Sequence, residues 1–349
     1  MSCGDRVPAC EDKPSVRGTS SSFANQLEAL KTMSTVVADT GEIESIRRFK
    51  PIDCTTNPSL VLKAVQLPQY AHFLDDAIAQ ETRSPTDSSR PQSDVADRLA
   101  TMIGRELLQI VPGRVSTEVD AHLSFDTGKT YDKALRICDL YSEKGVDLKR
   151  IYIKIASTWE GIRACEKLQK EGIDCNMTLL FSFAQAGACA DAGAALISPF
   201  VGRILDWYKK KEGREYTSQE DPGVKSVQKI YKYYKQYGYK TIVMAASFRN
   251  VGEIRELAGC DNITISPALL GELADATEPL ERKLWPDMGD CDLPRYDLGG
   301  SAAQRFKEMH GSEQMAVDKL KEGIDGFAKD QRKLEEMLAA IKGGAAIKQ

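Results

Sequence analysis

The sequence has 349 residues, of which 42% are hydrophobic and 28% are charged, as is typical of a soluble globular protein. Its formal net charge of −4 argues against nucleic acid and acidic membrane surfaces as general partners. No apolar run approaches the roughly 20 residues of a membrane span, and the N-terminus lacks the apolar core of a signal peptide. We therefore expect a cytoplasmic protein with no membrane partner.

The cysteines and histidines argue against disulfide and metal frameworks. Nine cysteines occur without a CxxC pair, which favours reduced thiols. The three histidines, His72, His122 and His310, do not have HExxH or HxxxH spacing. We expect neither a metal site nor another cofactor.

The chain order predicts one folded unit with short unstructured ends. Residues 1–22 are rich in Ser, Pro, Gly and charge without periodicity, which predicts a disordered tail. Residues 23–342 are expected to form a single domain, and residues 343–349 a flexible C-terminus. Residues 82–93 carry two prolines and four serines, which predicts a loop or insertion.

Eight short β-like segments recur within this domain, and helical patterns separate many of them. The predicted strands cover residues 36–39, 52–57, 115–120, 151–156, 175–181, 195–200, 241–247 and 263–267. The predicted helices cover residues 23–33, 94–110, 130–144, 159–171, 183–192, 222–237 and 251–258. Eight alternating units predict an α/β fold, a closed (β/α)8 TIM barrel. A doubly wound open sheet is the rival, but no GxGxxG turn follows the first strand.

A long amphipathic helix is predicted over residues 312–342, with an apolar stripe at Met315, Leu320, Ile324, Phe327, Leu334 and Leu338. Such a stripe most often packs on the outside of a barrel or on a second subunit. A coiled coil is less favoured because the repeat is not a strict heptad.

Lys154 lies in the middle of the apolar strand IYIKIA, residues 151–156. A lysine in a water-poor interior tends to lose its proton, and the neutral amine can form a Schiff base with a carbonyl substrate. The alternative is a lysine whose alkyl stem follows the apolar surface while its head reaches water. Taken alone, the strand favours this second interpretation.

Polar residues occur in or just after nearly every other predicted strand, and in a TIM barrel the strand carboxyl ends form the active site. They are Asp39, Asn57, Glu118, Asp120, Asn176, Thr178, Ser198, Ser247 and Arg249. Each alone could be a satisfied core polar group or a strand-end cap. Their convergence on one mouth favours a shared site.

These residue types suit cleavage of a carbon–carbon bond in a phosphorylated sugar. A protonated imine on Lys154 is an electron sink, and Asp39 or Glu118 can take the hydroxyl proton. The side chains suited to sugar hydroxyls are Asn57, Asn176, Thr178 and Ser198. Arg203 and Arg249, with Ser247, can bind a phosphate through charge-assisted hydrogen bonds. Arg203 could instead be a surface arginine, since it lies where the helix after the sixth strand should begin.

Two motifs in this set resemble the transaldolase family: DCTTNPS at residues 53–59 and IYIKIASTWEGI at residues 151–162. Further blocks similar to the family follow the same order: STEVD at 116–120, CNMTLLFS at 175–182, SPFVGR at 198–203 and SFRN at 247–250. The resemblance covers residues 23–340.

The resemblance implies a metal-free transfer of a dihydroxyacetone unit from sedoheptulose 7-phosphate to glyceraldehyde 3-phosphate, giving erythrose 4-phosphate and fructose 6-phosphate in the non-oxidative pentose phosphate pathway. It implies that Lys154 forms the Schiff base and that Asp39 exchanges the proton of the C4 hydroxyl. Glu118 and Thr178 would handle a catalytic water. The implied binding residues are Asn57, Asn176, Ser198 and Phe200 for the dihydroxyacetone part and Arg203, Ser247 and Arg249 for the phosphate. A homodimer is also implied.

Three alternatives stay open. An aldolase of the same class would release dihydroxyacetone to water, and pocket geometry rather than sequence separates it from the transferase. A catalytically silent barrel that binds sugar phosphates is expected to lack Lys154 or the carboxylates, which are present. Residues 229–237, KIYKYYKQY, interleave bases and aromatics as a nucleic-acid surface can, but an amphipathic helix with its tyrosines inward is favoured.

Overall fold

The computed structural model describes residues 23–81, 91–288, 291–296 and 301–343. The predicted tail at 1–22 lies outside the described residues, as do residues 82–90 of the predicted loop and residues 344–349 at the C-terminus.

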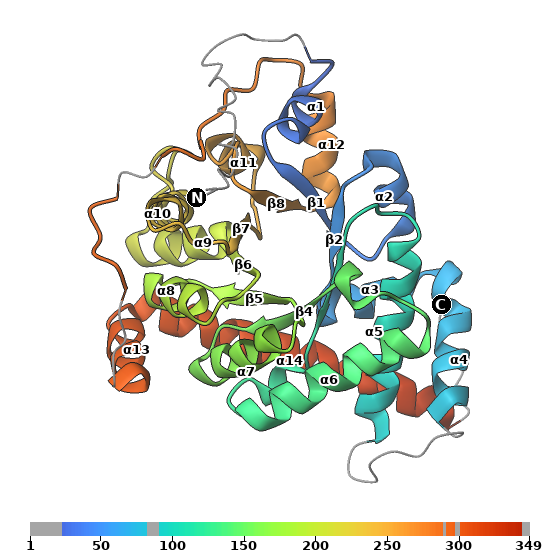
Figure 1. Cartoon of the computed structure of the whole chain (residues 1–349). Helices are drawn as coiled ribbons and strands as arrows, with labels where there is room; N and C mark the ends of the chain where they lie inside the picture. Colours follow the sequence, from blue (N-terminus) through green and yellow to red (C-terminus); the bar gives the residue numbers. More distant parts are fainter. Residues whose placement is uncertain (1–22, 82–90, 289–290, 297–300, 344–349) are drawn as a thin grey trace, which may run out of the picture.

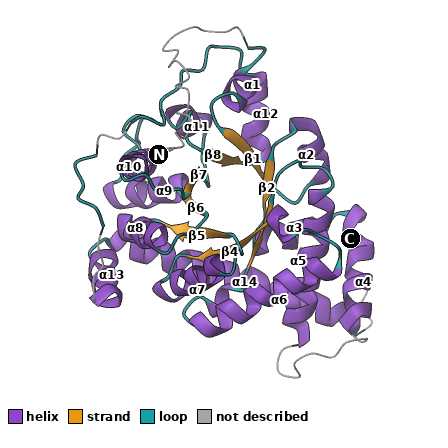
Figure 2. Ribbon diagram, in the orientation of Figure 1, coloured by secondary structure: helices purple, strands orange, loops and turns teal. Residues whose placement is uncertain are grey.

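Eight parallel strands form a closed barrel in sequence order, and β8 pairs with β1. The strands are β1 (Thr35–Asp39), β2 (Asp53–Thr55), β3 (Val115–Glu118), β4 (Ile151–Ala156), β5 (Cys175–Leu180), β6 (Leu196–Pro199), β7 (Ile242–Ala245) and β8 (Asn262–Ile265). Figures 1 and 2 show the barrel along its axis, with helices around it. The predicted (β/α)8 barrel is confirmed, and the doubly wound rival is wrong.

The strands are apolar runs because both faces of the sheet are covered. Every residue of β4 and β5 is buried, as expected for parallel strands between a barrel interior and an outer layer of helices. Several strands are shorter than predicted, since β2 covers three residues and β7 four. The residues that follow these strands therefore lie in the loops at the barrel mouth, where TIM-barrel sites form.

The described helices are α1 (Gln26–Lys31), α2 (Ile43–Phe49), α3 (Pro58–Ala64), α4 (Ala71–Glu81), α5 (Pro91–Leu108), α6 (Thr127–Glu143), α7 (Trp159–Lys170), α8 (Phe183–Asp191), α9 (Val201–Glu212), α10 (Pro222–Gln236), α11 (Val251–Glu256), α12 (Pro267–Asp275), α13 (Ala302–Gly311) and α14 (Gln314–Lys342). Three short 3₁₀ helices, η1 (Pro68–Tyr70), η2 (Ala121–Leu123) and η3 (Leu148–Arg150), accompany them.

All the predicted helices are present, with shifted ends. The predicted ranges lacked α2, α3, α4, α9, α12 and α13, most of which are short. Of these, only α9 was expected at all, as the helix after the sixth strand, without bounds. A signal existed for α3 and α12, because each begins with a proline directly after an Asn or Ser. The loop predicted for 82–93 is wrong in its last three residues, since α5 begins at Pro91.

Helix α14 lies across the carboxyl-end mouth of the barrel, a position that its apolar stripe alone did not reveal. Its buried Met315, Leu320, Ile324 and Phe327 pack with residues at or just after the ends of several strands, including Phe200. Figure 1 shows the helix passing behind β4 and β5, from α13 to α5 and α4. The expectation that it packs on the outside of the barrel or on a second subunit was therefore wrong for this face.

The α10 helix turns its tyrosines inward. Tyr231, Tyr233 and Tyr234 are each at most 1% exposed, whereas Lys229 is exposed to solvent. This confirms the amphipathic interpretation of residues 229–237. Within the described ranges, no helix is long and apolar enough to cross a membrane.

Candidate active site

Lys154 lies in the middle of β4 with its amine inside the barrel. The residue is only 4% exposed, its Nζ lies 3.3 Å from Glu118 Oε2, and it donates a 3.1 Å hydrogen bond to the carbonyl of Thr56. The alternative in which the ammonium reaches water is therefore wrong. A buried amine beside a carboxylate can exchange its proton locally, which prepares it for nucleophilic attack.

Glu118 is positioned by strand pairing, since it is the last residue of β3 and lies opposite Lys154 of β4 in the parallel register. Burial raises the pKa of its carboxyl, and the charge of Lys154 partly opposes this shift. The Glu118 carboxylate is thus a better proton acceptor than an exposed one. It is also close enough to Lys154 to take the amine's proton.

Asp39 ends β1 at the same mouth, where Thr55 binds it and Thr264 in turn contacts Thr55. The Thr55 hydroxyl donates a 2.8 Å hydrogen bond to Asp39 Oδ1, and the Thr55 and Thr264 hydroxyls lie 2.8 Å apart. Both threonines line the cavity around Lys154, and the sequence analysis missed them. A signal existed for Thr55, because it lies two residues before Asn57 in the predicted strand 52–57 and so shares its face.

Polar side chains of β5 and β6 form a buried chain of hydrogen bonds. Ser198 donates to Asn176 Oδ1 at 2.6 Å, and Asn176 Nδ2 donates to Ser116 Oγ at 3.1 Å. Thr178 lies two residues further along β5, and its buried hydroxyl has no hydrogen-bond partner among the described residues. Asn57 caps α3 by accepting from the amide of Leu60 at 2.9 Å.

The strand β5 is distorted next to Thr178. Leu179 has a φ of 52°, in the left-handed region that a bulky side chain rarely adopts, and the pairing of β5 with β6 shifts register there. The carbonyl of Leu179 accepts a 3.0 Å hydrogen bond from Gln185 Nε2, which helps to hold the distortion. Such backbone outliers cluster at functional sites.

One cavity brings most of the predicted site together. Its lining consists of Asp39, Thr55, Asn57, Lys154, Ser198, Phe200, Arg203, Ala246, Ser247, Thr264 and Phe327. Arg203 lies between two aromatic rings, with its guanidinium carbon 4.8 Å from the Phe200 centroid and 5.4 Å from the Phe327 centroid. Burial and the charge of Arg249 lower its pKa. Arg203 is therefore part of the cavity wall and not a surface arginine.

Arg249 does not line this cavity. Its guanidinium binds Asp206 through both Nε and Nη2, with Nη2 2.7 Å from Oδ2, and the side chain is exposed. Ser247 does line the cavity, with a φ of 63°, and its carbonyl accepts from the Gly202 amide and from Arg249 Nη1. The structure thus gathers Arg203 and Ser247 but leaves the Arg249 guanidinium at the rim.

Helix α14 supplies a wall of the cavity that the sequence analysis did not anticipate. Phe327 lines the cavity, and a polar contact on either side of it fixes the helix. Asp330 accepts from Ser59 of α3 at 2.5 Å, and Asp318 accepts from Trp207 of α9 at 2.9 Å. The helix is thereby tied to α3, which Asn57 caps, and to α9, which carries Arg203.

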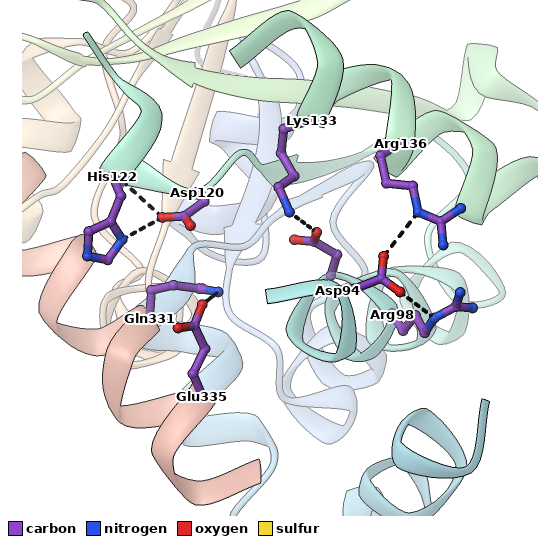
Figure 3. A network of polar contacts seen from close by, with 9 residues as sticks. Asp94, Arg98, Asp120, His122, Lys133, Arg136, Gln331 and Glu335 are labelled. Carbon is purple, nitrogen blue, oxygen red and sulfur yellow. Dashed lines mark hydrogen bonds and ion pairs between the residues drawn. The ribbon is translucent and has the colours of Figure 1, made fainter. Parts of the chain in front are cut away.

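Asp120, the other acid predicted for the third strand, belongs to a neighbouring polar network (Figure 3) and not to the lysine cavity. It caps η2, accepting from the amide of His122 at 2.9 Å, and lies 2.7 Å from His122 Nδ1. Arg332 of α14 lies 2.9 Å from His122 Nε2. Because arginine can only donate, His122 accepts at Nε2 and donates from Nδ1 to Asp120. Asp120 therefore helps to seat α14.

No group of three or more His, Cys, Asp or Glu side chains that could hold a metal ion occurs in the part of the chain that the structure describes. The seven cysteines in that part are all free.

The closed barrel, with a buried lysine and two carboxylates at its carboxyl-end mouth, is the arrangement of a (β/α)8 enzyme. Residues 36–338 match the profile of the family described as Transaldolase/Fructose-6-phosphate aldolase. The chain is 57% identical over 317 residues to a protein named Transaldolase from Pseudoalteromonas atlantica, covering 90% of this chain and 99% of that protein. It is 58% identical over 316 residues to a protein of the same name from Actinobacillus pleuropneumoniae serotype 3, with the same coverage. The chain belongs to the transaldolase/fructose-6-phosphate aldolase family.

Proposed function

We propose that this enzyme is a transaldolase, which moves a dihydroxyacetone unit from sedoheptulose 7-phosphate to glyceraldehyde 3-phosphate and releases erythrose 4-phosphate and fructose 6-phosphate. The observation that carries the proposal is the buried Lys154 amine beside Glu118, at the mouth where Asp39 also lies. The relatives' name supports the transferase over the aldolase alternative.

The reaction begins when the neutral Lys154 amine attacks the C2 carbonyl of the donor. Glu118 is placed to take the amine's proton, because its carboxylate lies 3.3 Å from Nζ. The carbinolamine then loses water to give a protonated imine. The unpartnered Thr178 hydroxyl and Glu118 would together hold that water and return it during hydrolysis.

Cleavage follows when Asp39 takes the proton of the C4 hydroxyl. The C3–C4 bond breaks, its electron pair moves into the imine to give an enamine, and the aldehyde product leaves. The enamine carbon then attacks the acceptor aldehyde, and Asp39 returns its proton to the new hydroxyl. The hydrogen bond from Thr55 orients Asp39 for both transfers.

The remaining residues hold the substrate. Asn57, Asn176 and Ser198 would bind the hydroxyls of the dihydroxyacetone part, with Phe200 against its carbon skeleton. Arg203 and Ser247 would bind the phosphate. Arg249 would join them by releasing Asp206 and binding the phosphate instead. This exchange is feasible because the Arg249 and Asp206 side chains are both exposed to solvent.

The proposal extends to a cytoplasmic homodimer, as the family resemblance implies. Light scattering after size-exclusion chromatography measures the assembly, and a monomer at micromolar concentration would exclude this part alone.

Borohydride trapping tests the mechanism. Reduction in the presence of fructose 6-phosphate should attach a three-carbon or six-carbon adduct to the peptide that contains Lys154, and peptide mass mapping locates it. Lys154→Met should abolish the adduct, whereas Lys210→Met, which changes an exposed lysine of α9, should retain it. An adduct on another lysine would refute the mechanism. Dihydroxyacetone accumulating from fructose 6-phosphate without an acceptor would favour the aldolase.

A further inference from the structure

A second cavity, of about 590 Å³, opens at the opposite end of the barrel from Lys154. Its lining includes Thr35, Ile242 and Asn262, which are the first residues of β1, β7 and β8. It shares no lining residue with the lysine cavity. Its volume is in the range of small-molecule binding sites, although the amino end of a TIM barrel normally serves stability.

The ionisable side chains of this cavity are mostly cationic. The cations are Lys31, Lys50, Lys235, Lys240 and Arg282, and the single carboxylate is Asp261. Five positive charges against one negative charge leave a formal local charge of +4, in a chain whose total is −4. The cavity is therefore a strong local exception to the acidic character of the chain, and it attracts anions.

Two of the five cations are neutralised within the protein. Lys31 pairs with Glu28 at 2.8 Å, and Lys235 pairs with Asp261 at 2.6 Å. Lys50, Lys240 and Arg282 form no ion pair with any residue in the described ranges. Arg282 donates from Nε to the carbonyl of Leu284 at 2.7 Å, and its guanidinium carbon lies 4.6 Å from the Trp285 centroid, but neither contact neutralises its charge. Three positive charges of the cavity are thus unneutralised by a carboxylate of the described residues.

The helix dipoles explain only part of this charge. Lys31 and Lys235 lie in the last turns of α1 and α10, where a cation stabilises the negative end of a helix. Lys240 and Arg282 lie outside the helices. Lys50 follows α2 with a φ of 49°, at a left-handed cap position that glycine normally occupies. A lysine there is unfavourable for the backbone, which suggests a use for its charge.

We propose that this amino-end cavity binds a small organic anion carrying two or more phosphoryl groups. Lys50, Lys240 and Arg282 would supply the charges, since lysine ammonium groups bind phosphate as point charges. Thr32 and Thr241 lie in the same lining. Ile52, which is 47% exposed, would give the carbon skeleton of the ligand an apolar contact.

Calorimetric titration with inorganic pyrophosphate at constant ionic strength tests the site. The Arg203→Met variant is titrated beside the unchanged protein, so that binding at the catalytic phosphate site is recognised and subtracted. One pyrophosphate should still bind to Arg203→Met. Adding Lys50→Gly and Lys240→Ser should weaken that binding at least tenfold.

The matched control replaces Lys210 and Lys225, two exposed lysines of α9 and α10 outside the cavity, by serine. It removes the same charge and should change the affinity less than twofold. Lys50→Gly relieves the left-handed strain, so its melting temperature should not fall and lost binding cannot reflect unfolding. The proposal is overturned if the Arg203→Met protein binds no pyrophosphate at millimolar concentration, or if both double substitutions weaken binding equally.

Discussion

The seating of α14 on the barrel mouth makes Gly323→Ala an informative substitution. A Cβ atom at Gly323 would lie 2.6 Å from Leu179 Cδ2 and 3.4 Å from Arg203 Nη1. Leu179 is fully buried and already has a left-handed backbone, so it has little room to move. The helix must instead shift by about 1 Å to restore ordinary contact, and overpacking of this kind costs about 1–3 kcal/mol.

Gly326 provides the matched control on the same helix. A Cβ atom there meets nothing within 4 Å, so Gly326→Ala should only gain helix propensity, about 1 kcal/mol. The gain is common to both substitutions and cancels in their difference. Gly323→Ala should therefore be about 1–3 kcal/mol less stable than Gly326→Ala in urea unfolding followed by circular dichroism.

The same shift should reach the active site. Phe327 and Arg203 face each other at the cavity wall, so moving α14 should raise the KM for fructose 6-phosphate several-fold in Gly323→Ala only. Equal stability and equal KM in the two variants would refute the inferred contact between α14 and β5.

Three further substitutions probe the site. Thr55→Val removes the hydrogen bond to Asp39 at almost constant volume and should lower kcat at least tenfold with little change in KM; an unchanged kcat would remove Thr55 from the mechanism. Asp206→Asn should lower the KM for phosphosugars, because it frees the Arg249 guanidinium to bind the phosphate. The fold should tolerate the change, since an exposed ion pair contributes at most about 1 kcal/mol to stability. An increased KM would contradict the partner exchange. Glu253, which accepts from the Arg249 amide, has a pKa raised to about 7 by burial. Its contribution to stability is thus present at low pH and is lost as pH rises from 4.5 through about 7. Glu253→Gln should therefore flatten the pH dependence of the unfolding free energy across that window.

The site could be predicted from the sequence to the extent that strand ends determine it. Asp39 and Lys154 lie on strands, so strand periodicity and the carboxyl-end rule of barrels place both at one mouth. Thr264 and Phe327 were missed because nothing local distinguishes them from packing residues. Arg249 was expected at the phosphate, but it pairs with Asp206 of α9, a residue 43 positions away in sequence.

The cationic cavity at the amino end of the barrel could not be predicted from the sequence either. Its positive side chains come from α1, from the end of α2, from α10 and from the loops before β7 and after α12. The net charge of the whole chain is −4, so the total does not reveal this local excess of positive charge. Composition reports the total charge, whereas binding depends on where the charges meet.

The sequence by itself determined the barrel, because alternating apolar strands and amphipathic helices record burial one element at a time. It also determined the residue types within and just after the strands, including Lys154 and its carboxylates. Only the tertiary structure decided that the Lys154 amine is buried against Glu118, that α14 covers the mouth, and that five cations surround one cavity. These features depend on contacts between residues far apart in the chain, which periodicity does not encode.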